Sequence, residues 1–191
     1  MRGQAYTLEA VIASLLLVSS LVFALQVTAV TPLSASTSNQ HIENQQRASA
    51  SGVLTAAEEA GALKEAVLYW DDSAGQYHNA TGQRRYYTSD PPKEFGNIIA
   101  RAFDGRGLAV NVLVYHNESE EPSRMVYRGE PSDNAVSASR TVTIYNGSEL
   151  TAPDATKTAG EADSFADVVP PASGGNSIYN VVRVEVTVWR M

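Results

Sequence analysis

Few side chains in this chain combine the type and spacing that catalysis or metal binding requires. Its histidines are far apart and its acid pairs are isolated: His41, His78 and His116; Glu58-Glu59, Asp71-Asp72 and Glu120-Glu121. There is no cysteine, no Gly-x-Ser-x-Gly elbow and no His-Glu-x-x-His motif. Acid pairs could hold a hard cation, but in an acidic chain they also form solvated surfaces. We therefore expect no catalytic residue, no metal and no cofactor, and predict that the protein is not an enzyme.

Chemical modification is indicated more directly, because the chain contains three Asn-x-Ser/Thr sequons for N-glycosylation. They begin at Asn79, Asn117 and Asn146, each in a segment predicted to be a loop or turn. Asn146 precedes Gly147, a pair that is also a hairpin-turn signal. Glycan transfer needs these asparagines outside the membrane, so their use depends on the topology of the chain.

One further acid, Glu9, stands at the start of a long apolar run. Residues 10–30 carry no charge over about 21 positions, or roughly 31 Å of helix, which matches the hydrocarbon thickness of a bilayer. A lone segment in lipid satisfies its backbone groups only as a helix, so we predict one membrane-spanning helix. A carboxylate at its edge is costly without a partner, which marks Glu9 as a functional residue. The alternative is that Glu9 is solvated among lipid headgroups.

The charges around this run predict its orientation. Arg2 and the amino terminus precede it, and the next basic residue is Arg47. Positive charge is retained in the cytoplasm, so we expect a cytoplasmic amino terminus and an extracellular remainder. The run is longer than a secretory signal and no clear Ala-x-Ala site follows it, although the small residues after Val30 leave cleavage there open.

The sequence Arg2-Gly3-Gln4, followed by Glu9 and the apolar run, resembles the class III signal peptide of archaeal type IV pilins. In that family a prepilin peptidase cuts after the basic-Gly pair, and the helix becomes part of a filament core. The resemblance implies cleavage between Gly3 and Gln4, and pairing of Glu9 with the new terminal amine of a neighbouring subunit. It implies four partners: the membrane, the prepilin peptidase, the pilus assembly platform protein and other pilin subunits. Glu9 is sixth from Gln4, whereas bacterial pilins place the acid fifth, and the resemblance covers residues 1–30 only.

The composition bears on the source and on the partners. The net charge is −7 and the isoelectric point about 4.9, without a basic stripe, so we expect no nucleic-acid partner. Lysine is scarce, with Lys64, Lys93 and Lys157 alone. An acidic excess keeps a protein soluble when other forces favour association, and together with few lysines it suggests a haloarchaeal source.

Beyond the apolar run the pattern predicts more helix and then strands. Pro32 would kink or end the first helix, and residues 33–39 are either a break or a continuation. A loose apolar stripe predicts a helix over residues 39–69, weakened at Gly52 and Gly61. Residues 71–92 are predicted as loop with a short strand at 84–88, residues 93–103 as a helix, residues 108–115, 124–128, 138–145 and 182–189 as strands, and residues 151–175 as an exposed loop.

These elements predict an α+β fold, in which a long N-terminal helix packs against a mainly antiparallel sheet of about four or five strands. The transmembrane half of that helix precedes an extracellular half. The expected organisation is a leader at 1–3, a transmembrane or filament-core helix at 4–30, a helical extension at 31–69 and a β-rich head at 70–191. Valines alternate through the last strand, so we expect one buried face and one solvent-exposed face, the latter formed by Arg183, Glu185, Thr187 and Trp189.

These sequence features are compatible with two functions. The first is a pilin-like structural subunit, major or minor, of an archaeal cell-surface filament of the type IV pilus class. The second is an extracellular binding or adhesion module on an uncleaved single-pass anchor that does not polymerise. The mature amino terminus separates the two, because only the first requires a cut after Gly3.

Overall fold

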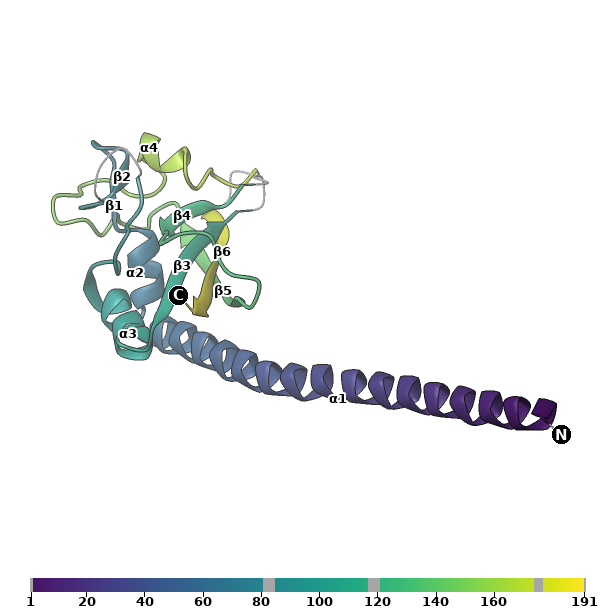
Figure 1. Ribbon diagram of the computed structural model, residues 1–191. Helices are drawn as coiled ribbons and strands as arrows, with labels where there is room; N and C mark the ends of the chain where they lie inside the picture. Colours follow the sequence, from purple (N-terminus) through teal and green to yellow (C-terminus); the bar gives the residue numbers. More distant parts are fainter. Residues whose placement is uncertain (1, 81–84, 117–120, 174–176, 191) are drawn as a thin grey trace. The chain divides into compact units, whose positions relative to one another are not determined.

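A computed structural model describes residues 2–80, 85–116, 121–173 and 177–190, with the side chains of residues 2–5 and 27–39 left out. The chain forms two compact units, Met1–Asn44 and Gln45–Met191. Helix α1 (Arg2–Glu59) begins in the first unit and ends in the second (Figure 1). The fold is α+β, as predicted, with an N-terminal apolar helix and a mainly antiparallel sheet.

The first unit consists of the N-terminal part of α1. Its segment Tyr6–Gln26 is 21 residues long and apolar enough to cross a membrane, and none of it is buried. The helical backbone continues through Pro32 and residues 33–39, so the continuation, not the break, is found there. A proline removes one backbone hydrogen bond, but the turns on either side keep theirs.

The second unit begins with the last turns of α1, which bury Ala50, Leu54 and Ala57. The single helix predicted to reach residue 69 is wrong, because α1 ends at Glu59 and α2 (Ala62–Val67) follows separately. Gly61 adopts φ 68°, the left-handed conformation that glycine takes without a steric penalty and that commonly ends a helix.

Residues 71–92 contain more structure than the predicted loop. Strands β1 (Trp70–Asp71) and β2 (Gln76–Tyr77) form an antiparallel pair. In the described part of the predicted strand at 84–88 there is one isolated bridge, between Tyr87 and Val126, so that strand is wrong. Helix α3 (Lys93–Phe103) has the predicted bounds and buries Phe95, Ile99 and Phe103, with Ile98 half-buried.

The main sheet has four antiparallel strands in the order β4-β3-β6-β5. Their bounds lie within a few residues of the predicted ones: β3 (Leu108–Tyr115), β4 (Ser123–Val126), β5 (Val136–Tyr145) and β6 (Ile178–Arg190). In β6, Val182, Val184, Val186 and Val188 are fully buried, in one hydrophobic cluster with apolar residues of α1, α2 and α3. This face of the sheet and the helices make the core of the second unit.

The opposite face of the sheet is only partly exposed to solvent. Arg183 is exposed, as predicted, but Thr187 and Trp189 are 8% and 5% exposed. The Asn111 side chain explains part of this cover, because its amide donates to the Gly129 carbonyl at 2.9 Å and its oxygen accepts from the Arg128 backbone N–H at 2.8 Å. The segment between β4 and β5 therefore lies over this end of the face.

The predicted exposed loop at 151–175 is irregular over most of its described residues, as predicted, but it is not fully exposed. It contains the short helix α4 (Asp163–Ala166) and buries Ala159, Phe165 and Val169. The turn at Asn146-Gly147 is present, with the Ser148 N–H donating to the Tyr145 carbonyl at 2.9 Å. It does not close a hairpin, because β5 pairs with β6 and not with the segment that follows the turn.

Candidate functional site

The largest exposed apolar surface among the described side chains is that of Tyr6–Gln26 in α1. Leu17 is 70% exposed and Phe23 is 69% exposed. Large apolar patches are rare on proteins that stay monomeric in water, and they mark surfaces that meet a membrane or another protein. The first unit therefore carries a surface that needs a cover of lipid or of other protein chains.

The serines within this segment do not interrupt its apolar character. Each of their hydroxyls donates to a carbonyl three or four residues earlier: Ser14 to Val11 at 2.8 Å, Ser19 to Leu15 at 2.7 Å and Ser20 to Leu17 at 2.9 Å. A hydroxyl that is satisfied within its own helix loses little on transfer to an apolar environment. The segment thus presents side chains that suit lipid or a helix bundle.

Glu9 is the single charged residue of Tyr6–Gln26, and its side chain is exposed. Within the described side chains no ion pair or hydrogen bond holds its carboxylate. Arg2, Gly3 and Gln4 lie in the first turns of the same helix, and their side chains are outside the described part. The predicted cleavage and assembly residues therefore share one continuous helix that starts at Arg2.

The sequons differ in their surroundings. Asn79 is exposed with φ 62°, although Thr81 of its sequon is outside the described residues, and the Asn117 sequon is outside them too. Asn146 is exposed, but its N–H donates to the Ser177 carbonyl at 2.9 Å and its carbonyl accepts from Gly160 at 3.0 Å. The Ser148 hydroxyl accepts from the Tyr145 N–H at 3.1 Å, so the Asn146 sequon is part of a hydrogen-bonded turn.

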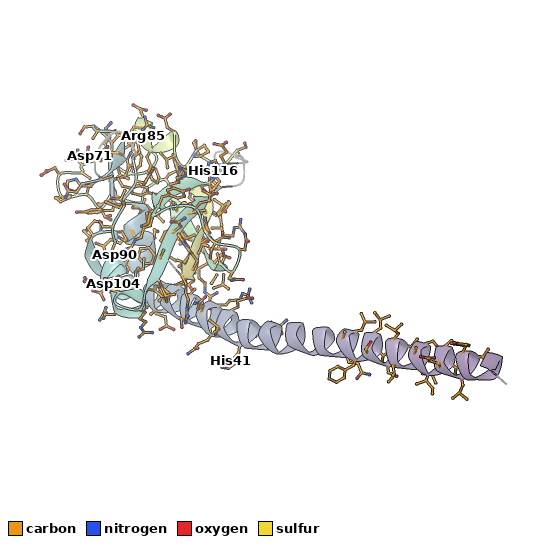
Figure 2. All side chains as sticks on the ribbon, in the orientation of Figure 1. His41, Asp71, Arg85, Asp90, Asp104 and His116 are labelled. Carbon is orange, nitrogen blue, oxygen red and sulfur yellow. The ribbon has the colours of Figure 1, made fainter. Side chains whose placement is uncertain are left out.

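The histidines do not form a shared site. His78 packs edge-on against Tyr69, with ring centres 5.2 Å apart, and its Nδ1 is 3.9 Å from Asp71. His116 lies well away from Asp71 within the second unit (Figure 2). No group of three or more histidines and carboxylates that could hold a metal occurs in the ranges that the structure covers.

The acid pair Asp71-Asp72 organises the connection of β1 to α4. The Asp71 carboxylate accepts from the Ser73 hydroxyl at 2.6 Å and from the Ser73 and Ala74 N–H groups at 3.0 Å. Asp72 accepts from the Ser164 hydroxyl at 2.7 Å and N–H at 2.9 Å, and from Lys157 at 2.5 Å. Hydrogen bonds from Ser73 above all lower the pKa of Asp71. Burial alone would raise the pKa of Asp72, but Lys157 and Ser164 together lower it.

The Asp72 contacts predict a loss of stability in acid. Its pKa is lowered in the folded state, so the contacts stabilise the fold above the unfolded pKa near 3.8 and are lost as the pH falls through the folded pKa. We expect Asp72→Asn to lower the unfolding free energy at pH 7 by about 1.5–3 kcal/mol, the range for hydrogen bonds to charged groups. Thermal unfolding followed by circular dichroism from pH 7 to pH 2 measures this.

The difference in unfolding free energy between Asp72→Asn and the wild type should become smaller as the pH falls below 3.8, the ordinary pKa of an aspartate. Asp133→Asn is the matched control, because Asp133 is exposed in the segment between β4 and β5. A gap of constant size down to pH 2 would contradict the role of the Asp72 charge.

Sequence reasoning missed a second surface, an open cleft of about 580 Å³ in the second unit. It lies over outward-facing residues of β3 and β4, and its lining includes Arg85, Tyr86, Arg124 and Tyr127. We call it the tyrosine cleft. The run Arg85-Tyr86-Tyr87 is a weak signal for it, but the sequence does not indicate that Arg124 and Tyr127 join this run.

The geometry defines a class: a helix able to cross a membrane, joined in sequence to an α+β unit with a four-stranded antiparallel sheet. Comparison with family models then identifies the family. The chain belongs to DUF7288, a family of unknown function whose model matches residues 2–188, the apolar helix included. Comparisons with curated proteins and with solved structures found no match.

Proposed function

We propose that this protein is a pilin-like structural subunit, major or minor, of an archaeal cell-surface filament of the type IV pilus class. The observation that carries the proposal is the exposed 21-residue apolar segment Tyr6–Gln26, with no buried residue and one acid near its start. Such a surface is covered by lipid before assembly and by the same segment of other subunits afterwards. The serine hydroxyls donate to carbonyls of their own helix, so the segment is compatible with lipid and with a bundle of helices.

The proposal includes a topology and a processing step. The amino terminus is cytoplasmic and the second unit is extracellular, in line with Arg2 before the apolar segment and no basic residue until Arg47. A prepilin peptidase removes residues 1–3 by cutting between Gly3 and Gln4. The pilus assembly platform protein then passes the subunit from the membrane into the filament.

A second function is a membrane-anchored binding module that does not polymerise. The observation that favours it is the tyrosine cleft of the second unit, since a filament core needs no such feature. The apolar helix then serves as a permanent single-pass anchor. Met1 or Arg2 stays at the amino terminus of the mature chain.

The mature amino terminus decides between the two functions. We expect mass spectrometry of the protein, purified from membranes and from sheared surface filaments, to find Gln4 as the first residue. Gly3→Leu should retain the leader in the same host, whereas Ala5→Leu, beyond the cut, should not. An intact Met1 or Arg2 end in every fraction contradicts the subunit proposal, as does an extracellular product that lacks residues 6–26.

Glu9→Ala should separate membrane insertion from assembly. The variant should fractionate with membranes as the wild type does, because removing a charge from an apolar helix favours lipid. Its incorporation into filaments should fall at least about tenfold, since loss of one member of a buried ion pair costs about 3–5 kcal/mol. Quantitative blotting of sheared filaments and membranes measures both. Gln26→Ala, at the other end of the segment, is the control, and equal incorporation of all three proteins would show that Glu9 has no assembly role.

A further inference from the structure

The tyrosine cleft has the size and the mixed lining of a ligand site. Its volume of about 580 Å³ lies within the range of roughly 300–1,000 Å³ that is typical of small-molecule pockets. Asn111, Leu113 and Thr187 come from the outward side of the sheet, at its partly covered end. Figure 2 shows Arg85 at the end of the second unit that also carries β2 and α4.

Two half-buried tyrosines form an aromatic wall of this cleft. The rings of Tyr86 and Tyr127 meet edge to face, with centres 5.7 Å apart. The Arg124 guanidinium lies 4.3 Å from the centre of the Tyr127 ring, and the Tyr127 hydroxyl donates to Glu130 at 2.6 Å. These contacts hold the rings in place, so that a ligand meets a prepared surface and not a mobile one.

Hydrogen-bonding groups of both kinds stand beside the rings. Neither Arg85 nor Arg124 has a carboxylate partner among the described residues, whereas Arg128 pairs with Asp90 and Arg183 with Glu185. Glu121 and Glu130 also line the cleft, so its charges are balanced. Guanidinium groups only donate and carboxylates only accept, which suits a ligand whose groups do both.

A buried hydroxyl adds an independent sign of a ligand. Tyr77 lines the same cleft and is 1% exposed, and in the described part of the chain its hydroxyl has no hydrogen-bond partner. Buried polar groups in native proteins are nearly always paired, so this one leaves hydrogen-bonding capacity to be met.

The edge of the sheet argues against a peptide ligand. Peptides are often bound by adding a strand to a free edge. The β4 edge is already paired with Tyr87. The Tyr87 N–H donates to the Met125 carbonyl at 2.9 Å, and the Tyr87 carbonyl accepts from the Tyr127 N–H at 2.9 Å. A ligand in this cleft is therefore held by side chains and not by strand pairing.

We propose that the tyrosine cleft binds a saccharide. The apolar C–H faces of a sugar ring stack on Tyr86 and Tyr127, as apolar ligand faces do on aromatic walls. Its hydroxyls, which both donate and accept, meet the guanidinium groups of Arg85 and Arg124 and the carboxylates of Glu121 and Glu130. The proposal concerns the second unit alone, so it stands whether or not the chain forms filaments.

The test uses the full-length chain in a detergent without a sugar head group. Saturation-transfer NMR with soluble tetrasaccharides of glucose, galactose, mannose and N-acetylglucosamine should detect binding of at least one at millimolar concentration. Arg124→Gln and Tyr86→Ala should each weaken the binding about tenfold or more. Two exposed residues outside the cleft provide matched controls, Arg106→Gln and Tyr145→Ala, and these should bind as the wild type does.

Tyr77→Phe distinguishes a loss of binding from a loss of folding. It keeps the buried ring and removes the unpartnered hydroxyl, so thermal stability should not fall, while affinity for the saccharide drops severalfold. The proposal is overturned if the wild type binds none of the four saccharides, or if Arg85→Gln, Arg124→Gln and Tyr86→Ala all bind undiminished. Binding of a tyrosine- and arginine-rich peptide in place of every saccharide would overturn it too.

Discussion

Gly96→Ala is expected to remove about 3 kcal/mol or more from the unfolding free energy of the second unit, at or beyond the upper end of the usual range for overpacking. A Cβ on Gly96 would stand 1.6 Å from the carbonyl oxygen of Pro91 and 2.8 Å from its carbonyl carbon. Both are backbone atoms, so no side-chain rotation relieves the overlap. Relief requires α3 to move from its place over the sheet, which would expose Phe95 and Ile99.

Gly52→Ala is the matched control for that change, because Gly52 also lies in a helix. A Cβ there would meet nothing within 4 Å. Alanine is the better helix former by about 1 kcal/mol, so this variant should be slightly more stable than the wild type. Chemical unfolding of the full chain in detergent, followed by circular dichroism, compares the two. Similar changes of either sign at both positions would contradict the packing of α3 against Pro91.

The elements that the sequence predicts well are those with a regular pattern of burial. The alternating valines of β6 and the apolar side of α3 each reflect one buried face, so period and burial agree. The apolar segment of α1 is predicted equally well, because an uninterrupted apolar run of this length is typical of a helix able to cross a membrane. In these places local composition alone determines the element.

Sequence reasoning failed where a single backbone conformation or a distant contact decides. Gly61 ends a helix by adopting a left-handed conformation. The presence of a glycine in the sequence does not by itself predict that conformation. At Pro32 the sequence left a break and a continuation both open, and the helix continues because one lost hydrogen bond is small beside the turns around it. The outward side of β6 is covered at one end by the Arg128–Gly129 backbone, a contact made through Asn111 and not visible in the pattern of β6.

The candidate sites divide in the same way. Glu9 could be proposed from the sequence because the argument for it depends only on its own neighbourhood, one acid before an apolar run. The tyrosine cleft could not, since Arg85 and Arg124 are brought together by the bridge of Tyr87 to Val126. That bridge joins a segment without regular structure to an edge strand, and no periodicity predicts such a contact.

The segment between β5 and β6 is the clearest case, and Phe165→Ala tests it. Phe165 is fully buried, stacks on Tyr179 with ring centres 5.7 Å apart, and meets Trp70 edge-on at 6.1 Å. Truncation of a buried phenylalanine leaves a cavity and costs about 3–5 kcal/mol. Domains are commonly stable by only about 5–15 kcal/mol, so we expect a large fall in the unfolding midpoint.

The reason for so large an effect is that α4 joins parts of the chain that are far apart in sequence. Ser164 accepts from the Trp70 indole N–H at 2.9 Å and donates to Asp72, so loss of the Phe165 ring also loosens β1. Thr156→Ala, at an exposed position in the same segment, should change the unfolding free energy by less than about 0.5 kcal/mol. Thermal unfolding of both variants in detergent provides the comparison. If Phe165→Ala were as mild as Thr156→Ala, the segment would be a surface loop after all, and the core would end at the sheet.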